Sequence, residues 1–219
     1  MPESDQPATD QPESFLPETA FRRIDESSDA NFYRSPRLVT HIDDAAITAL
    51  TQVYREVLPA GGAVLDLMSS WISHLPPEVS YRRVVGLGMN AVELGNNPRL
   101  ESFAVQDLNL EPRLPFADAE FDAATICVSI DYLTRPLEVL RDLARVVRPG
   151  GPLIISFSNR CFPTKAVMVW HSLDDAGRIQ LVERYLLEAE CWDDIRSVDR
   201  SPNPGRSDPL YVVLANNRT

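Results

Sequence analysis

Short apolar runs alternate with helical patterns along most of the chain. Each run is bounded by glycine, proline or charged residues. Strands that are covered on both faces are apolar throughout, so these runs predict buried parallel strands. They cover residues 63–67, 84–87, 103–106, 123–128 and 153–157, and two later strands are expected at 195–198 and 210–214.

Amphipathic helices are predicted before and between these strands. Residues 43–58 place apolar side chains at helical spacing, and Asp43 or Asp44 can cap the first turn. Residues 136–148 begin with a proline and stop at a Pro-Gly-Gly sequence, and a later helix spans 174–190. Alternating strands and helices, with two strands at the end, predict an α/β fold with a doubly wound sheet.

The composition changes near the N-terminus. Residues 1–30 contain four prolines, eight acidic residues and two arginines, which is typical of a disordered tail, although residues 21–24 could dock onto the body. We expect the domain to occupy 31–219, with a lid segment and the first helix at 31–58. With 219 residues, 44% of them apolar, the chain suits one globular domain, and its net charge of −11 disfavours non-specific binding to nucleic acid.

The cysteines and the hydropathy of the chain indicate its expected cellular location. Cys127, Cys161 and Cys191 form no CxxC pair, so no metal site and no disulfide framework are expected. No apolar run is long enough to span a bilayer, and acids stand where a signal peptide would be basic and then apolar. We expect a cytoplasmic protein whose partner is a small molecule, with no nucleic acid and no membrane; the oligomeric state is left open.

Polar residues follow the predicted strands at the positions where ligands bind in open α/β sheets. The first strand leads into Asp66-Leu67-Met68-Ser69-Ser70-Trp71, and the second into Gly88-Met89-Asn90. The third leads into Gln106-Asp107-Leu108-Asn109, and the fourth into Ser129-Ile130-Asp131-Tyr132. Because parallel strands end at one edge of the sheet, these residues predict a ligand site there.

A series of short motifs runs through the second half of the chain. Leu114-Pro115-Phe116 precedes Phe121-Asp122, and Arg148-Pro149-Gly150-Gly151 follows the next strand and helix. In these motifs, residues 40–215 resemble class I S-adenosylmethionine-dependent methyltransferases, as a divergent type 11-like branch with a Leu-Met-Ser-Ser-Trp first loop. The resemblance implies a Rossmann-like fold, a mostly parallel seven-stranded sheet with helices on both faces, and methyl transfer from S-adenosylmethionine to a small molecule.

The resemblance also implies which residues surround the cofactor. Asp66 corresponds to an acid near the methionine part, Asp107 to the acceptor of the adenine amino group, and Leu108 to an apolar contact with the ring. The other residues expected around the cofactor are Leu67, Met68, Ser69, Ser70, Gly88, Asn90, Gln106, Ser129, Tyr33 and Arg37.

Two positions depart from the family pattern. Only the small residues Ser69 and Ser70 stand where a glycine-rich loop is usual. Gly88 stands where an acid usually holds the ribose hydroxyls, which leaves that role to Asn90 or Glu93. These departures keep a second interpretation open, namely a catalytically silent methyltransferase-like protein that serves as a binding or partner subunit.

Candidates for the acceptor side follow the fourth and fifth strands. Asp131 and Tyr132 are the catalytic candidates, because a base is required only if the acceptor must lose a proton. The isolated histidines, His41 and His74 among them, are interpreted as structural. The residues expected at the substrate are Tyr132, Asn159, Arg160 and Phe162.

Cationic side chains suggest the charge of the ligand. Arg37 offers a planar fork to a carboxylate of either the cofactor or the substrate, and Tyr33 could close over the sulfonium. Lys165, the only lysine, and the nearby Arg160 suggest an anionic or carboxylate-bearing acceptor.

A weaker alternative is an NAD-dependent oxidoreductase. The stretch Gly86-Leu87-Gly88-Met89-Asn90-Ala91 matches GxGxxA after a strand, and Asp107 follows about 20 residues later, as in dinucleotide-binding folds. However, the helix that this motif requires is short before Asn96-Asn97-Pro98, and the motif falls on the second strand instead of the first.

Overall fold

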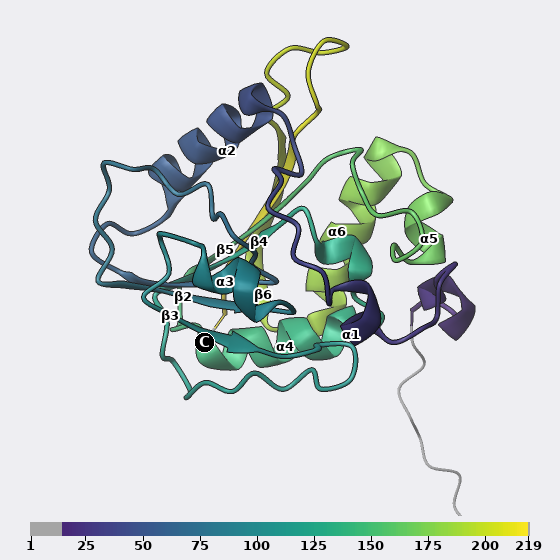
Figure 1. Cartoon of the computed structure of the whole chain (residues 1–219), viewed down its shortest axis with the longest axis horizontal. Coiled ribbons are helices and arrows are strands. Elements are labelled where there is room, and N and C mark those ends of the chain that lie inside the picture. The colour runs from purple at the N-terminus through teal and green to yellow at the C-terminus, as the bar shows by residue number, and fades with distance from the viewer. Residues whose placement is uncertain (1–14, 219) are drawn as a thin grey trace, which may run out of the picture.

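Seven strands form the centre of the protein in the computed structural model, which describes residues 15–218 (Figure 1). The strands are β1 (Ala63–Leu67), β2 (Arg83–Gly88), β3 (Ser102–Val105), β4 (Ala123–Cys127), β5 (Pro152–Phe157), β6 (Trp192–Asp199) and β7 (Tyr211–Asn217). Their order is β3-β2-β1-β4-β5-β7-β6, and β7 runs antiparallel to both of its neighbours. The predicted doubly wound, mostly parallel sheet is confirmed.

Helices cover both faces of this sheet, as predicted. They are η1 (Glu18–Phe21), α1 (Asp29–Phe32), α2 (Asp44–Val57), α3 (Ala91–Gly95), η2 (Ile130–Tyr132), α4 (Pro136–Val146), α5 (Met168–His171) and α6 (Asp175–Ala189). Figure 1 shows α2 on one side of the sheet, with α4 and α6 on the other. Among the described residues, no helix is both long and apolar enough to cross a membrane.

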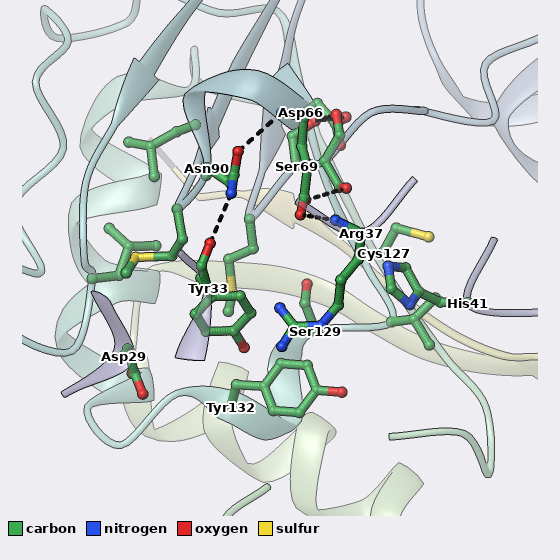
Figure 2. A pocket seen from close by; sticks show the side chains of 18 of the residues that line it. Asp29, Tyr33, Arg37, His41, Asp66, Ser69, Asn90, Cys127, Ser129 and Tyr132 are labelled. Carbon is green, nitrogen blue, oxygen red and sulfur yellow. Dashed lines mark hydrogen bonds between the residues drawn. The ribbon is translucent and has the colours of Figure 1, made fainter. Parts of the chain in front are cut away.

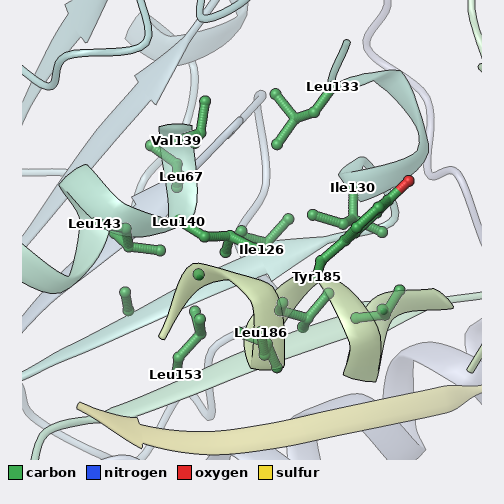
Figure 3. Packing of buried hydrophobic residues seen from close by; sticks show 14 of the residues in the cluster. Leu67, Ile126, Ile130, Leu133, Val139, Leu140, Leu143, Leu153, Tyr185 and Leu186 are labelled. Carbon is green, nitrogen blue, oxygen red and sulfur yellow. The ribbon is translucent and has the colours of Figure 1, made fainter. Parts of the chain in front are cut away.

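Apolar packing fixes α4 and α6 against the sheet (Figure 3). Leu67, Ile126 and Leu153 of the strands share one buried cluster with Leu140 of α4 and Leu186 of α6. Each of these side chains is fully buried. Because burying a leucine or isoleucine contributes about 1.5–3 kcal/mol, this cluster is a main source of the stability that holds the strand ends in place.

The helix boundaries follow from local chemistry. The side chain of Asp43 caps α2 by accepting a hydrogen bond from the Ala46 amide, and Asp174 caps α6 in the same way from Gly177. Pro136 occupies the first turn of α4, where its missing N–H costs nothing. The predicted starts of these helices are therefore confirmed to within one residue.

The connection from β1 to β2 contains no helix within the described chain. Residues 68–82 form turns and irregular backbone, and Pro76-Pro77 lies in their middle. Prolines supply no N–H group for a helical hydrogen bond, which explains why this stretch does not coil. The first loop is consequently held by side-chain hydrogen bonds.

The third strand was predicted to be buried, and this prediction is wrong. β3 is the edge strand of the sheet, and the side chains of Phe103 and Val105 are 42% and 53% exposed. A short apolar run has the same sequence pattern at the edge of a sheet as in its middle, because the pattern does not report the strand order.

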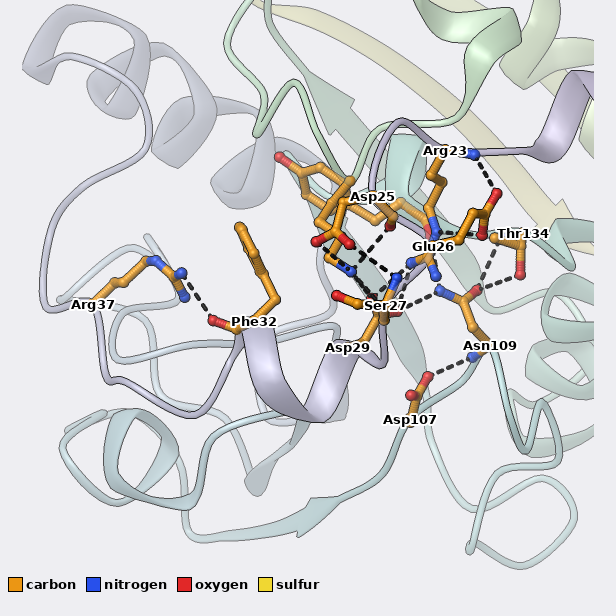
Figure 4. Close-up of polar contacts among 12 residues, drawn as sticks. Arg23, Asp25, Glu26, Ser27, Asp29, Phe32, Arg37, Asp107, Asn109 and Thr134 are labelled. Atoms are coloured by element: carbon orange, nitrogen blue, oxygen red, sulfur yellow. Dashed lines mark hydrogen bonds and ion pairs between the residues drawn. The ribbon is translucent and has the colours of Figure 1, made fainter.

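The N-terminal segment also differs from the prediction. Residues 15–30 lie against the domain, while residues 1–14 of the predicted tail lie outside the described residues. Arg23 pairs with Asp29 (Figure 4). The fully buried Lys165 donates to the carbonyl groups of Asp25 and Ser27. Lys165 also forms ion pairs with Asp25 and Asp29, at 3.1 Å each. This buried ion cluster docks residues 21–30, so Lys165 is not available to a ligand.

Candidate functional site

A pocket of about 1100 Å³, counted with its open mouth, lies at the carboxyl ends of β1, β2, β3 and β4 (Figure 2). In the sheet order this is the switch point of a doubly wound fold, where ligands bind. Residues from the strand ends form its floor. Residues 29–41, called the lid segment from here on, begin two residues before the predicted boundary and add Asp29, Tyr33, Arg37 and His41. The residues predicted for the cofactor that line the pocket are Asp66, Met68, Ser69, Ser70, Gly88, Asn90, Gln106, Asp107, Leu108, Ser129, Tyr33 and Arg37.

Leu67 is the exception among the predicted cofactor residues. Its side chain is fully buried in the apolar cluster under the sheet and does not line the pocket. Successive side chains of a strand point to opposite faces, so Leu67 packs toward α4.

The carboxylate of Asp66, at the end of β1, is hydrogen-bonded within the protein. It accepts hydrogen bonds from the hydroxyl groups of Ser69, Ser73 and Thr125, at 2.6, 2.7 and 3.0 Å. Burial raises the pKa of Asp66, and these three hydroxyl groups partly oppose that shift. The side chain therefore organises the first loop from the edge of the pocket.

The close approach of the first loop explains the glycine at the end of β2. The Ser69 amide donates to the Leu87 carbonyl at 2.8 Å, and a Cβ at Gly88 would lie 2.2 Å from the Ser69 oxygen. A Cβ at Gly86 would lie 2.4 Å from a methyl group of Leu100. Internal packing thus accounts for both glycines. A dinucleotide-binding motif also requires a longer helix after the glycines, and α3 has only five residues. The dinucleotide-binding interpretation is therefore not supported.

The first loop also holds the lid segment. The hydroxyl of Ser70 donates to Glu93 at 2.6 Å, and the other oxygen of Glu93 accepts from the Arg37 amide at 2.7 Å. The indole N–H of Trp71 donates to the Val39 carbonyl at 2.9 Å. The Leu-Met-Ser-Ser-Trp loop is therefore a connector between the strand ends and the lid segment.

Asn90 and Glu93, the predicted substitutes for the ribose-binding acid, are both engaged within the protein. The side-chain oxygen of Asn90 caps α3, and its nitrogen donates to the carbonyl groups of Tyr33 and Arg34 at 2.8 and 3.2 Å. Glu93 is buried and bonded as described above. Both residues line the pocket and also fasten the lid segment, and their role toward the ribose stays a prediction.

Asp107 is half-buried at the end of β3, and Leu108 beside it is buried. The Asp107 carboxylate accepts from the Asn109 amide at 3.0 Å, and burial, aided by the nearby Asp29, raises its pKa. The side chain of Asn109 donates to Asp29 and to the Tyr132 carbonyl, both at 3.0 Å (Figure 4). Asn109 thus connects the end of β3 to the lid segment and to η2.

Three buried polar atoms that line the pocket lack a hydrogen-bond partner among residues 15–218. They are Nη1 of Arg37, Nδ1 of His74 and Oγ of Ser129. A buried polar group without a partner costs about 1–3 kcal/mol, so such atoms mark places where a ligand can supply the bond. The pocket therefore suits a ligand with several polar groups, as S-adenosylmethionine has.

Only part of the predicted acceptor side meets the pocket. Tyr132 and Phe162 line it with stacked rings, and the Tyr132 oxygen accepts from the Phe162 amide at 2.8 Å. Burial raises the pKa of Tyr132 well above its usual value, so its hydroxyl remains protonated. Arg160 is 64% exposed and pairs with Asp208 outside this pocket, and Asn159 is also exposed and lies outside it.

Asp131 does not line the pocket, so its catalytic candidacy is not supported. The side chain is buried, and one carboxylate oxygen has no partner among the described residues. Burial raises its pKa to about 8, opposed by a backbone hydrogen bond and by Arg178. The short helical turn η2 rotates Asp131 into the core, while its neighbour Tyr132 reaches the pocket.

Two histidines that sequence reasoning treated as structural also line the pocket. Burial lowers the pKa of His41, and it lowers the pKa of His74 to about 4, so both rings are neutral at pH 7. The His41 ring lies edge-on to Phe162, with 5.5 Å between centroids. No local pattern marks either residue, because 33 positions of chain separate them and only the fold brings them to one pocket.

Comparisons with known proteins agree with this architecture. The family described as a methyltransferase domain (Methyltransf_11) matches residues 74–155. A demethylmenaquinone methyltransferase of Paenarthrobacter aurescens is 35% identical over 88 residues, which are 40% of this chain and 31% of that protein. The chain thus spans about a third of the length of this curated relative.

Solved structures share the fold at low sequence identity. The cyclase SpnF superposes with a TM-score of 0.61 at 16% identity, over 87% of this chain and 92% of that one. An S-adenosylmethionine-dependent methyltransferase of Mesorhizobium loti does so with a TM-score of 0.54 at 15% identity, over 77% of this chain and 98% of that one. Residues 74–155 therefore match a methyltransferase domain, and the chain shares its fold with solved S-adenosylmethionine-dependent methyltransferases.

Proposed function

We propose that this protein transfers the methyl group of S-adenosylmethionine to a small-molecule acceptor. The observation that carries the proposal is the pocket at the switch point of the sheet, with Asp107 on its floor and unpartnered polar atoms in its walls. The relative from Paenarthrobacter aurescens, named for demethylmenaquinone, supports a small molecule as the acceptor.

The adenine end of the cofactor is assigned to Asp107 and Leu108. A carboxylate accepts a hydrogen bond from an exocyclic amine, and an apolar side chain covers a ring face. Leu108 is 5% exposed, so it offers a fixed apolar wall, and the hydrogen bond from the Asn109 amide holds the Asp107 carboxylate in place.

The lid segment supplies the conditions that methyl transfer requires. An in-line displacement depends on alignment of the acceptor and on exclusion of water. Trp71, Asn90 and Glu93 fasten the lid segment over the floor through four hydrogen bonds to its backbone. If the acceptor must lose a proton, either of the two neutral histidines that line the pocket, His41 or His74, can serve as the base.

A catalytically silent binding protein is the second candidate. The observation in its favour is that the side chains of Asn90 and Glu93 form hydrogen bonds to the lid segment and the first loop. The only carboxylate near the end of β2 within the described residues is therefore already hydrogen-bonded within the protein. Such a protein would bind the cofactor weakly or not at all, which makes affinity for the cofactor the first test.

The test is a calorimetric titration of the full chain with S-adenosylmethionine and S-adenosylhomocysteine, beside NAD. Asp107→Ala removes the proposed adenine contact, and the matched control Glu101→Ala removes an exposed carboxylate outside the pocket. A hydrogen bond to a charged group contributes about 1.5–3 kcal/mol, so we expect Asp107→Ala to weaken binding about 10- to 100-fold and Glu101→Ala to leave it unchanged. If neither sulfur compound binds the unaltered protein, methyl transfer is excluded.

A further inference from the structure

Arg37 places a cation in the pocket that has no anionic partner among residues 15–218. Its Nη2 donates to the Phe32 carbonyl at 2.9 Å, while Nη1 is buried and unpartnered. The guanidinium carbon lies 4.3 Å from the centroid of the Phe32 ring and 5.2 Å from that of Phe162. In Figure 2 this group reaches into the cavity from the lid segment.

Four carboxylates line the pocket, and within residues 15–218 none of them forms an ion pair with Arg37; they are Asp29, Asp66, Glu93 and Asp107. Asp29 pairs with Arg23 and Lys165, and Asp66 accepts from three hydroxyl groups. Glu93 accepts the backbone amide of Arg37 and the hydroxyl of Ser70, but forms no ion pair with the guanidinium group. A charged group that lines a pocket without a partner is suited to receive an ion of opposite charge.

We propose that Arg37 binds a carboxylate or a similar planar anion of the methyl acceptor, so that the acceptors are planar anionic molecules. The choice of the acceptor as the source of this anion rests on the proposed function. The stacked rings of Tyr132 and Phe162 line the pocket, and Phe32 packs edge-on against Phe162. Flat apolar walls of this kind favour a planar body next to the charged group.

Electrostatics favours an anionic acceptor over a neutral one. The sulfonium of the cofactor and the guanidinium of Arg37 are like charges in one partly enclosed pocket, where water screens them less than in bulk solvent. An anion beside Arg37 reduces their repulsion. In the transfer, a lone pair of the acceptor forms the bond to the methyl carbon, the electron pair of the broken carbon–sulfur bond stays on sulfur, and the anion held by Arg37 is unchanged.

The carboxylate of the cofactor itself is a second anion that Arg37 could bind. Phe162 follows β5 and Tyr132 follows β4, whereas Asp107 follows β3 at the opposite side of the pocket floor. Arg37 therefore lies with the residues on the acceptor side, although only an experiment with both sources separates them.

The test uses benzoate and its neutral analogue benzamide as probes. Each is titrated into the full chain by calorimetry or by NMR shifts, with and without saturating S-adenosylhomocysteine. Arg37→Gln removes the charge, and Arg34→Gln is the matched control, since Arg34 is an exposed arginine of the same segment. We expect the unaltered protein and Arg34→Gln to prefer benzoate about tenfold, and Arg37→Gln to lose that preference while it binds S-adenosylhomocysteine as before.

Several results would overturn the proposal. One is that benzoate binds no better than benzamide, or that neither binds. Another is that Arg37→Gln loses affinity for S-adenosylhomocysteine but not for methylthioadenosine, which lacks the amino acid part; Arg37 then holds the cofactor carboxylate. Arg37→Lys keeps the charge and guards against misfolding of the Gln variant. Failure of the unaltered protein to bind S-adenosylhomocysteine would instead refute the proposed function, while the titrations without it still test Arg37.

Discussion

The floor of the pocket and its lid segment are positioned by different kinds of interaction. Each floor residue lies within a few positions of a strand, as Asp107 does after β3. The lid segment is placed by contacts between distant residues, since Asn90 meets Tyr33 across 57 positions and Glu93 meets Arg37 across 56. The sheet itself therefore positions the floor residues, whereas a small number of hydrogen bonds position the lid segment.

The largest expected effect comes from breaking the ion cluster that docks the N-terminal segment. Lys165→Met leaves Asp25 and Asp29 short of a buried positive charge, and breaking a buried pair costs about 3–5 kcal/mol. Urea denaturation measures this loss. Arg184→Met is the control, because it breaks an exposed pair with Glu188. Similar losses in both variants would show that the cluster does not stabilise the docked N-terminal segment.

An intermediate effect concerns Asp131, which lies two residues beyond the floor residue Ser129. The pKa of Asp131 is about 8 in the folded protein and near 3.8 ordinarily, so between these pH values the unfolded chain releases a proton that the folded chain keeps. The free energy of unfolding then falls as pH rises, by about 2–3 kcal/mol between pH 5 and 7 from this group.

Asp131→Asn is expected to remove this contribution. The comparison is the slope of stability against pH, measured by urea denaturation at several pH values. The exposed Asp118→Asn should keep the slope of the unaltered protein. An unchanged slope in Asp131→Asn would mean that this carboxylate faces solvent or the pocket, and the boundary of the floor would have to be moved.

The smallest effect tests the contact between the floor and the first loop. Gly88→Ala forces a Cβ against the Ser69 oxygen, which should cost about 1–3 kcal/mol and weaken S-adenosylhomocysteine binding. Gly95→Ala is a matched change in α3, where the nearest atom lies 4.0 Å away, and it should leave stability equal or slightly higher. Equal changes of stability in Gly88→Ala and Gly95→Ala would contradict this account of the loop.

Much of the fold and of the floor could be predicted because both depend on local pattern. The cap at Asp43 and the strands that precede Asp66 and Asp107 follow from neighbouring residues. Local pattern did not reveal that β3 is an edge strand or that Asp131 turns into the core, since these depend on strand order and on one helical turn.

The lid segment shows the limit of sequence reasoning most clearly. Arg37 and Tyr33 were expected at the pocket because of their chemistry, and both line it. Lys165 is predicted from the sequence to face an anionic acceptor, but it is fully buried among backbone carbonyls and carboxylates. Whether a cation serves a ligand or the protein depends on partners far away along the chain, and the sequence does not identify them.

The most direct test of the account is a crystal structure of the full chain with S-adenosylhomocysteine. The account predicts the adenine amino group within hydrogen-bond distance of the Asp107 carboxylate, the ring against Leu108, and the sulfur toward the side of the pocket where Arg37, Ser129 and Tyr132 lie. Adenine bound elsewhere, or a ligand outside this pocket, would contradict it.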